Sequence, residues 1–250
     1  MPSRVLLAAG LCLALSSAGF AASRVLIVPL QPGDRAAYDF TSTTNTPTHE
    51  DHEDGSFELI RGKNGAFQLN FLPDGALNET FPAILQKDGT LDLDLTSGVD
   101  QPPFVLQRFN QVATIVASAP PVFKTGDSWK TKINVPLPLG QSVDVPVSVQ
   151  VSAATDSDFA LDAAGQITTR LMSTPPTPGQ QVTAPVGGST TVSSDAGLPL
   201  TLNLHMTAHV VAGKLAKADG TLHSTVQTAR GDVLEITSRW ALAVHKAPAS

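Results

Sequence analysis

A strict alternation of apolar and polar side chains near the C-terminus is the feature that most constrains the fold. Residues 200–210 read LTLNLHMTAHV, in which every even-numbered position is apolar, and residues 234–244 repeat the pattern with Leu234, Ile236, Trp240 and Leu242. Successive side chains of a β-strand point to opposite faces, so each segment has one dry and one wet side. The alternation predicts an antiparallel sheet packed on a single face.

Strand signals occupy most of the remaining chain. Turn residues such as Asn64-Gly65, Ala218-Asp219-Gly220 and Arg230-Gly231 separate short segments rich in β-branched and aromatic residues. The predicted strands cover residues 23–30, 37–44, 57–61, 66–72, 81–86, 90–95, 128–135, 143–153, 159–162, 167–172, 200–215, 221–229 and 232–245.

One segment, at about 103–118, departs from this pattern. Val105, Phe109, Val112 and Val116 recur at spacings of four, three and four, which places them on one side of a helix. Prolines precede the segment and follow it. Its valines and isoleucine also suit a strand, but the period favours an amphipathic helix. The sequence thus predicts a mainly β fold, a curved antiparallel sheet forming a half-barrel or sandwich, with this helix packed on its apolar face.

The N-terminus has the pattern of a secretory signal peptide. Arg4 precedes an apolar run at residues 5–15, and Gly19-Phe20-Ala21 forms a small-x-small cleavage site. We expect residues 1–21 to be removed and the protein to be exported to a periplasm or secreted. The only cysteine, Cys12, lies in this peptide. Export without cysteine favours a bacterial envelope.

Residues 22–250 are expected to form a single β-rich domain. The segment at about 174–199 is rich in Pro, Gly, Ser and Thr and has no periodicity, so it could be an interdomain linker. The three predicted strands that follow it have only one apolar face, and they are too few to form a stable unit alone. We therefore interpret the segment as a loop within one domain.

The charge and hydropathy of the chain limit its partners. The net charge is −6, and it becomes more negative when Arg4 is removed with the signal peptide. Nucleic acids and anionic membrane surfaces require a basic patch, so neither is expected as a partner. No apolar run after the signal peptide is long enough to form a transmembrane helix.

The densest group of ionisable side chains lies at residues 49–54. His49, His52, Asp51 and Glu53 have the nitrogen and carboxylate ligands that suit zinc, nickel or copper. The run also lies between two predicted strands, where such residues normally face water. We favour a solvated hairpin tip and keep a weak divalent-metal site as the alternative. No other cofactor is expected.

The triplet Gly126-Asp127-Ser128 resembles the nucleophile block of the GDSL-type hydrolases. The resemblance covers three residues, and the chain continues with Trp129 where that family has leucine. The nearest acid and histidine, Asp219 and His223, lie one residue further apart than the Asp-x-x-His pair of that family. Gly-Asp pairs also precede the predicted strands near residues 35 and 233, which favours a role in turns. An enzyme is therefore the least favoured class.

The pattern best fits a binding or carrier module for an apolar ligand or a protein partner. A curved sheet partly closed around a helix is an architecture by which some periplasmic carriers shelter lipid tails. The alternative is a structural or adaptor protein in which the helix fills the apolar face completely. The predicted ligand-binding residues, on the concave face, are Leu202, Leu204, Met206, Leu234, Ile236 and Trp240.

Overall fold

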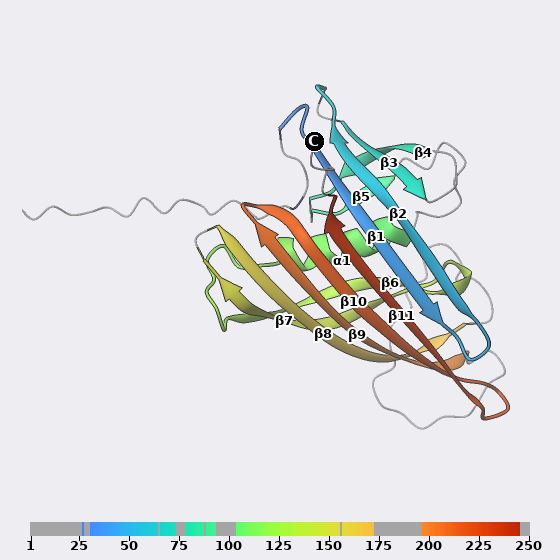
Figure 1. Ribbon diagram of the computed structural model, residues 1–250. Coiled ribbons are helices and arrows are strands. Elements are labelled where there is room, and N and C mark those ends of the chain that lie inside the picture. The colour runs from blue at the N-terminus through green and yellow to red at the C-terminus, as the bar shows by residue number, and fades with distance from the viewer. Residues whose placement is uncertain are drawn as a thin grey trace, which may run out of the picture.

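The described residues form a single curved antiparallel sheet with one α-helix on its inner side (Figure 1). A computed structural model describes residues 27, 31–64, 66–73, 79–87, 89–93, 104–155, 157–172 and 197–245. The sheet has eleven strands and does not close, because β5 and β6 form its two free edges. The predicted fold class is confirmed. In the part of the chain described, no helix is long and apolar enough to span a bilayer.

The strand order is β5-β4-β3-β2-β1-β11-β10-β9-β8-β7-β6. Two meanders, β1–β5 and β6–β11, are therefore joined by pairing between the first strand and the last. The elements are β1 (Arg35–Asn45), β2 (Glu50–Arg61), β3 (Phe67–Pro73), β4 (Glu79–Leu85), β5 (Leu91–Leu93), α1 (Phe104–Ala117), β6 (Ser128–Pro136), the short 3₁₀ helix η2 (Pro138–Gly140), β7 (Ser142–Ala154), β8 (Asp158–Leu171), β9 (Leu198–Val211), β10 (Lys214–Gln227) and β11 (Val233–Val244).

The three Gly-Asp pairs all form turns that precede strands. Gly33, Gly126 and Gly231 have φ of +93°, +91° and +89°, a conformation that glycine adopts without steric cost. The side chains of Asp34 and Asp127 accept hydrogen bonds from backbone N–H groups three residues earlier. These turns lead into β1, β6 and β11, which confirms the interpretation of the pairs as turn chemistry.

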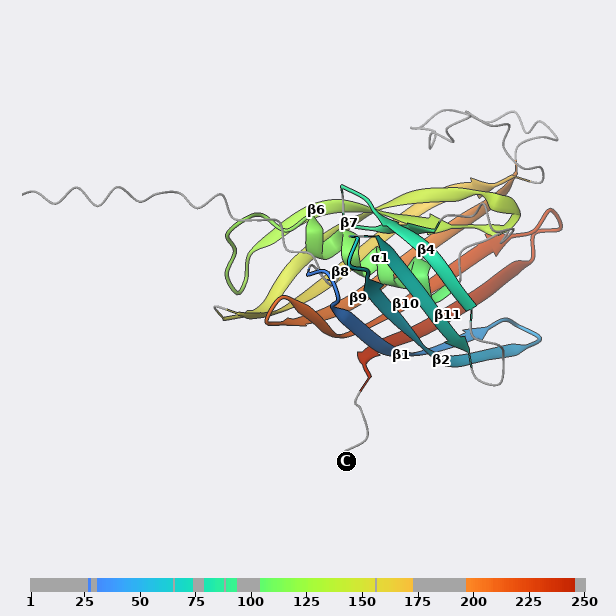
Figure 2. The same ribbon diagram turned by 90° about the horizontal axis from the view of Figure 1, so that it is seen from above.

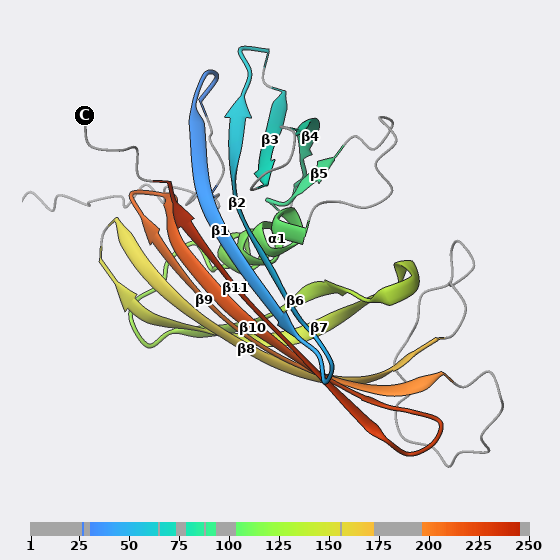
Figure 3. The same cartoon turned by 45° about the vertical axis from the view of Figure 1, so that its right-hand side comes forward.

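Helix α1 lies against the concave face of the sheet (Figures 2 and 3). The buried face of α1 includes the predicted stripe, so the predicted helix is confirmed with bounds within a residue of those expected. Phe109 contacts the rings of Tyr38 and Phe57, each with its centroid 5.8 Å away. These aromatic contacts fix the middle of α1 to β1 and β2.

The inner face of the sheet follows the predicted alternation. Every even-numbered residue from Leu200 to Val210 of β9 is buried, whereas the odd-numbered residues between them are exposed or half-buried. Valines at odd positions of β7 continue the same inner face. The apolar core is therefore a layer between this face and α1.

The structure corrects the predicted boundaries of three strands. The predicted strands at 159–162 and 167–172 are one strand, β8, which passes straight through Gly165. The predicted strand at 200–215 ends earlier, because Ala212 and Gly213 both have positive φ and form the hairpin turn. The expected turn at residues 218–220 is instead in the middle of β10. The predicted strand at 23–30, except Ile27, and the signal peptide lie outside the described residues, as does the 174–199 segment up to residue 196.

Candidate ligand-binding site

The six predicted ligand-binding residues lie on one inner face but in two different environments. Leu202, Leu204 and Met206 of β9 are buried, as is Trp240 of β11. Further along β11, Ile236 is half-buried and the side chain of Leu234 is 43% exposed. Along β11 the concave face is therefore buried as far as Ser238 and uncovered from Ile236 onwards.

The uncovered part forms a short apolar surface that we call the distal strip, made of Ser224, Val226, Leu234 and Ile236. Val226 of β10 pairs with Leu234 of β11, and Ser224 pairs with Ile236. All four side chains are half-buried or exposed. Their positions continue the line of Trp240 and Leu242, because alternate residues of one strand share a face.

A narrow crevice lies where the first turns of α1 meet β1 and β11. The crevice has no room for a group the size of a water molecule, and its lining includes Phe40, Ser42, Phe104, Val105, Arg108 and Trp240. Most of these side chains are apolar. Arg108 and Trp240 are the lining residues whose side chains contain N–H groups.

Arg108 is a buried cation. Its side chain is 4% exposed, and its guanidinium lies over the ring of Phe104 at 4.2 Å from the centroid. One terminal nitrogen donates a hydrogen bond of 3.0 Å to Oε1 of Gln111, whereas Nε has no partner. Among the described residues no carboxylate forms an ion pair with Arg108. Burial lowers the pKa of Arg108 to about 10.

Trp240, which also lines the crevice, has an unsatisfied donor of its own. The residue is 4% exposed, and its Nε1 has no hydrogen-bond partner. Its ring lies directly on the backbone of Gly220, where a Cβ atom would come within 2.5 Å of Cζ2. The glycine thus allows the large ring to lie flat on the sheet below the start of α1.

Replacing Arg108 with methionine is expected to raise the free energy of unfolding by about 1–2 kcal/mol at neutral pH. The lowered pKa corresponds to a cost of about 3 kcal/mol for burying the charge, and loss of the Gln111 hydrogen bond offsets about 1 kcal/mol of that gain. The unfavourable free energy of burying the charge is fully present at neutral pH. It is lost only as the pH rises from about 10, the pKa of Arg108 in the folded protein, towards the higher pKa of an exposed arginine. Urea unfolding followed by circular dichroism measures the change. Destabilisation by more than 1 kcal/mol would show that the guanidinium holds the fold together.

Two side chains of α1 form hydrogen bonds with backbone groups of the two edge strands. Asn110 accepts a hydrogen bond from the N–H of Leu91 in β5 and donates one to its carbonyl, both of 2.8 Å. Gln111 donates to the carbonyl of Asn134 in β6 at 3.1 Å. The helix therefore spans the opening of the half-barrel and occupies edge positions where a further strand would pair.

The four candidate metal ligands do not converge. The stretch lies at the exposed tip of the β1–β2 hairpin, as predicted, but the turn is limited to residues 46–49 and the run from Glu50 to Asp54 already belongs to β2. Alternation along β2 places His52 on the outer face, whereas Asp51 and Glu53 lie on the inner one. Over the described ranges, no group of three His, Cys, Asp or Glu residues is arranged to hold a metal ion.

The histidines of this run instead form exposed pairs with nearby carboxylates. His49 lies 2.8 Å from Asp51, and His52 lies 2.8 Å from Asp54. His52 also bonds to the hydroxyl of Thr43 on β1. Burial raises the pKa of the Glu53 carboxyl. Of these contacts, only the bond between His52 and Thr43 joins neighbouring strands, and the two His–Asp pairs lie within one segment of the chain.

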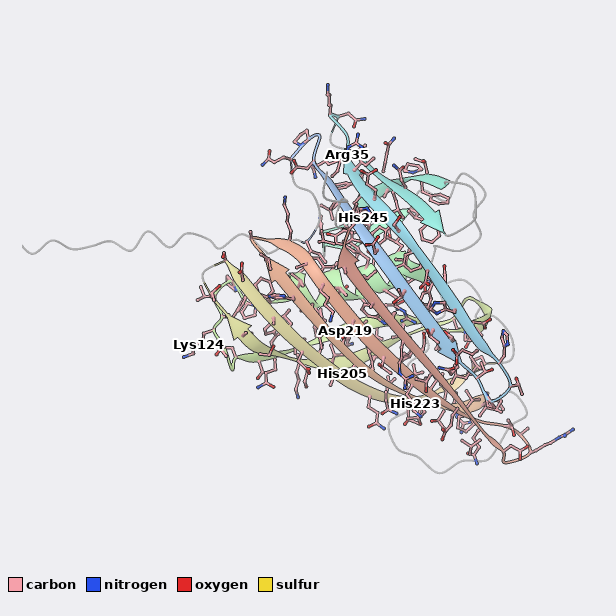
Figure 4. The ribbon with its side chains drawn as sticks, viewed as in Figure 1. Arg35, Lys124, His205, Asp219, His223 and His245 are labelled. Carbon is pink, nitrogen blue, oxygen red and sulfur yellow. The ribbon has the colours of Figure 1, made fainter. Side chains whose placement is uncertain are left out.

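The residues compared with a hydrolase site are also far apart. Ser128 is exposed at the start of β6, which lies four strands from β10 in the sheet. Asp219 and His223 of β10 bond to Thr207 and Thr237 on neighbouring strands (Figure 4). His205 and His245 pair with Asp162 and Asp39 at 3.0 and 2.7 Å on the same convex side. These polar residues of the convex surface therefore form local pairs with residues on neighbouring strands.

Comparison with known proteins assigns no family. Neither protein-family models nor curated protein sequences gave a match to this chain. The functional argument therefore depends on the contacts, burial and charge of the concave face.

Proposed function

We propose that the protein is an exported, non-enzymatic binding or carrier module whose ligand lies on the concave face of the sheet. The ligand has an apolar part that packs on the distal strip beside the covered core. The protein acts in the periplasm or is secreted, after removal of the signal peptide predicted at residues 1–21.

The observation that carries this proposal is the extension of the apolar inner face beyond α1. Met206 and Trp240 are buried, and Trp240 lies beside the first turns of α1, but Leu234 remains 43% exposed on the same face. Trp240, which lines the crevice, lies on the same face of β11 as this surface, with the buried Ser238 between them. Contact with an apolar chain would remove the exposed surface from water, at about 25 cal/mol per Å².

The proposal predicts that the purified protein binds a fluorescent amphiphile and that Leu234→Asp weakens this binding about tenfold or more. A carboxylate on the distal strip would have to be desolvated when an apolar chain packs against it. Titration with dansylaminoundecanoic acid, followed by dansyl emission, measures the affinity. Mass spectrometry of a solvent extract tests for amphiphiles that copurify with the protein.

Val233→Asp is the matched control. Val233 is 56% exposed and directly precedes Leu234, but it lies on the opposite face of β11. The same charge at this position should leave the affinity within about twofold. Absence of both probe binding and copurifying amphiphile would refute the proposal and favour the structural or adaptor alternative. Equal weakening by both variants would show that the ligand does not lie on the distal strip.

A further inference from the structure

The unpaired guanidinium of Arg108 indicates what kind of ligand the crevice accepts. A buried cation normally has a carboxylate partner or is fully hydrogen-bonded, because it has lost its water. Arg108 has only Gln111 and the ring of Phe104, and its Nε has no partner. The site thus contains a positive charge whose counter-charge is absent from the described residues around it.

Two further features favour an anion at the same place. Trp240 also lines the crevice, and its Nε1, on the ring edge that lies over Gly220, is a second buried donor without an acceptor. The crevice also includes Phe104 and Val105 at the start of α1, where the partial charge of a helix is positive. No acidic residue in the first turn offsets this partial charge. All three features suit an oxyanion, which accepts several hydrogen bonds at once.

We propose that Arg108 and Trp240 bind the anionic head of a single-chain amphiphile, a carboxylate or a phosphate, while its alkyl chain follows the distal strip. This proposal rests on the proposed function and specifies the ligand further. The distal strip begins on the same face of β11 as Trp240, so a head in the crevice directs its tail towards Ile236 and Leu234. The crevice must open to admit the head, because it has no room for a group the size of a water molecule.

The experiment compares dansylaminoundecanoic acid with its methyl ester, which has the same chain and fluorophore but no charge. The wild-type protein should bind the acid about 10- to 100-fold more tightly than the ester, as expected for charge-assisted hydrogen bonds. Arg108→Met should bind both probes with similar affinity, and Arg108→Lys should keep part of the preference. The acid-to-ester ratio is the readout because a purely structural change would alter both affinities together.

Trp240→Phe provides a second variant that retains an aromatic ring. It removes Nε1–H and should weaken binding of the acid by about 2- to 10-fold with little effect on the ester. Acetate and inorganic phosphate separate an amphiphile head from a free anion. Both ions should compete with the acid only at millimolar concentration, because they lack the alkyl chain.

Four outcomes would overturn the proposal in distinguishable ways. Equal wild-type affinities for acid and ester would remove the anion site but leave the carrier function intact. Binding of neither probe would refute both proposals. Retention of the acid preference in Arg108→Met would place the anion elsewhere. Displacement of the acid by micromolar phosphate would show a small-ion site instead of an amphiphile site.

Discussion

Replacing Gly220 with alanine is expected to lower the free energy of unfolding by about 3 kcal/mol. The added Cβ would lie within 2.5–2.8 Å of three atoms of the buried Trp240 ring. Relief requires the ring to move out of the core or β10 to shift, and overpacking of this kind costs about 1–3 kcal/mol or more. Urea unfolding followed by far-ultraviolet circular dichroism measures the loss without depending on tryptophan fluorescence.

A double-mutant cycle tests this explanation. In a Trp240→Leu background the clashing ring atoms are gone, so Gly220→Ala should cost less than about 1 kcal/mol. Gly213→Ala controls for glycine replacement in the same hairpin: its Cβ would meet nothing within 4 Å, although its φ is +74°. That variant should lose only about 1 kcal/mol from backbone strain. A cost at Gly220 that is unchanged by Trp240→Leu would contradict the packing argument.

Replacing Asn110 with alanine should destabilise the protein by about 2–4 kcal/mol. The asparagine side chain satisfies both the N–H and the carbonyl of Leu91, a residue that is 1% exposed on the edge strand β5. Each buried backbone group left without a partner costs about 1–3 kcal/mol. The loss should be local as well as global, so hydrogen exchange at the Leu91 amide should accelerate more than exchange in β9.

Thr114→Ala is the control for this second prediction. Thr114 lies one turn further along α1, and its hydroxyl donates a hydrogen bond of 2.9 Å to the carbonyl of Asn110 within the helix. Its replacement should change stability by less than about 1 kcal/mol and leave exchange at Leu91 unaffected. If the two variants are equally stable, the contact between α1 and the edge of β5 contributes little.

The contact between Asn110 and Leu91 shows which parts of the fold could be predicted from the sequence and which could not. The alternation at residues 200–210 and the helical spacing around Phe109 each depend on residues a few positions apart, so the sequence alone predicted strand, helix and the faces that become buried. Asn110 reads as an ordinary polar helix residue. Its partner, Leu91, becomes its neighbour only when β5 lies against α1.

Gly220 also shows the difference between what the local sequence predicts and what the tertiary structure decides. The triplet Ala218-Asp219-Gly220 has turn chemistry, which explains why a hairpin was expected there. Gly220 instead accommodates the ring of Trp240, which lies opposite it on the neighbouring strand. The real turn uses Ala212 at φ +49°, a conformation that alanine rarely adopts. Only the pairing of β9, β10 and β11 distinguishes the two positions.

The candidate site was only partly visible in the sequence. Four of the six predicted ligand-binding residues are buried, whereas Leu234 and Ile236 lie on the uncovered distal strip. Residues of both groups alternate in the same way along their strands, so strand periodicity does not distinguish the covered part of the face from the uncovered part. Arg108 was overlooked, although it lies three residues after Val105 and four before Val112, on the helix face predicted to be buried. A cationic residue on a helix face predicted to be buried is the feature of the sequence that could have identified Arg108.

The sequence by itself determined that this chain forms an antiparallel sheet with one dry face and one amphipathic helix, because these properties arise from the local periodicity of side chains. The tertiary structure decided which edges the helix closes, which part of the apolar face stays exposed, and which buried donors remain unpaired. Those properties depend on contacts between segments far apart in the chain, such as α1 with β5 and Gly220 with Trp240. Local patterns contain no information about such distances.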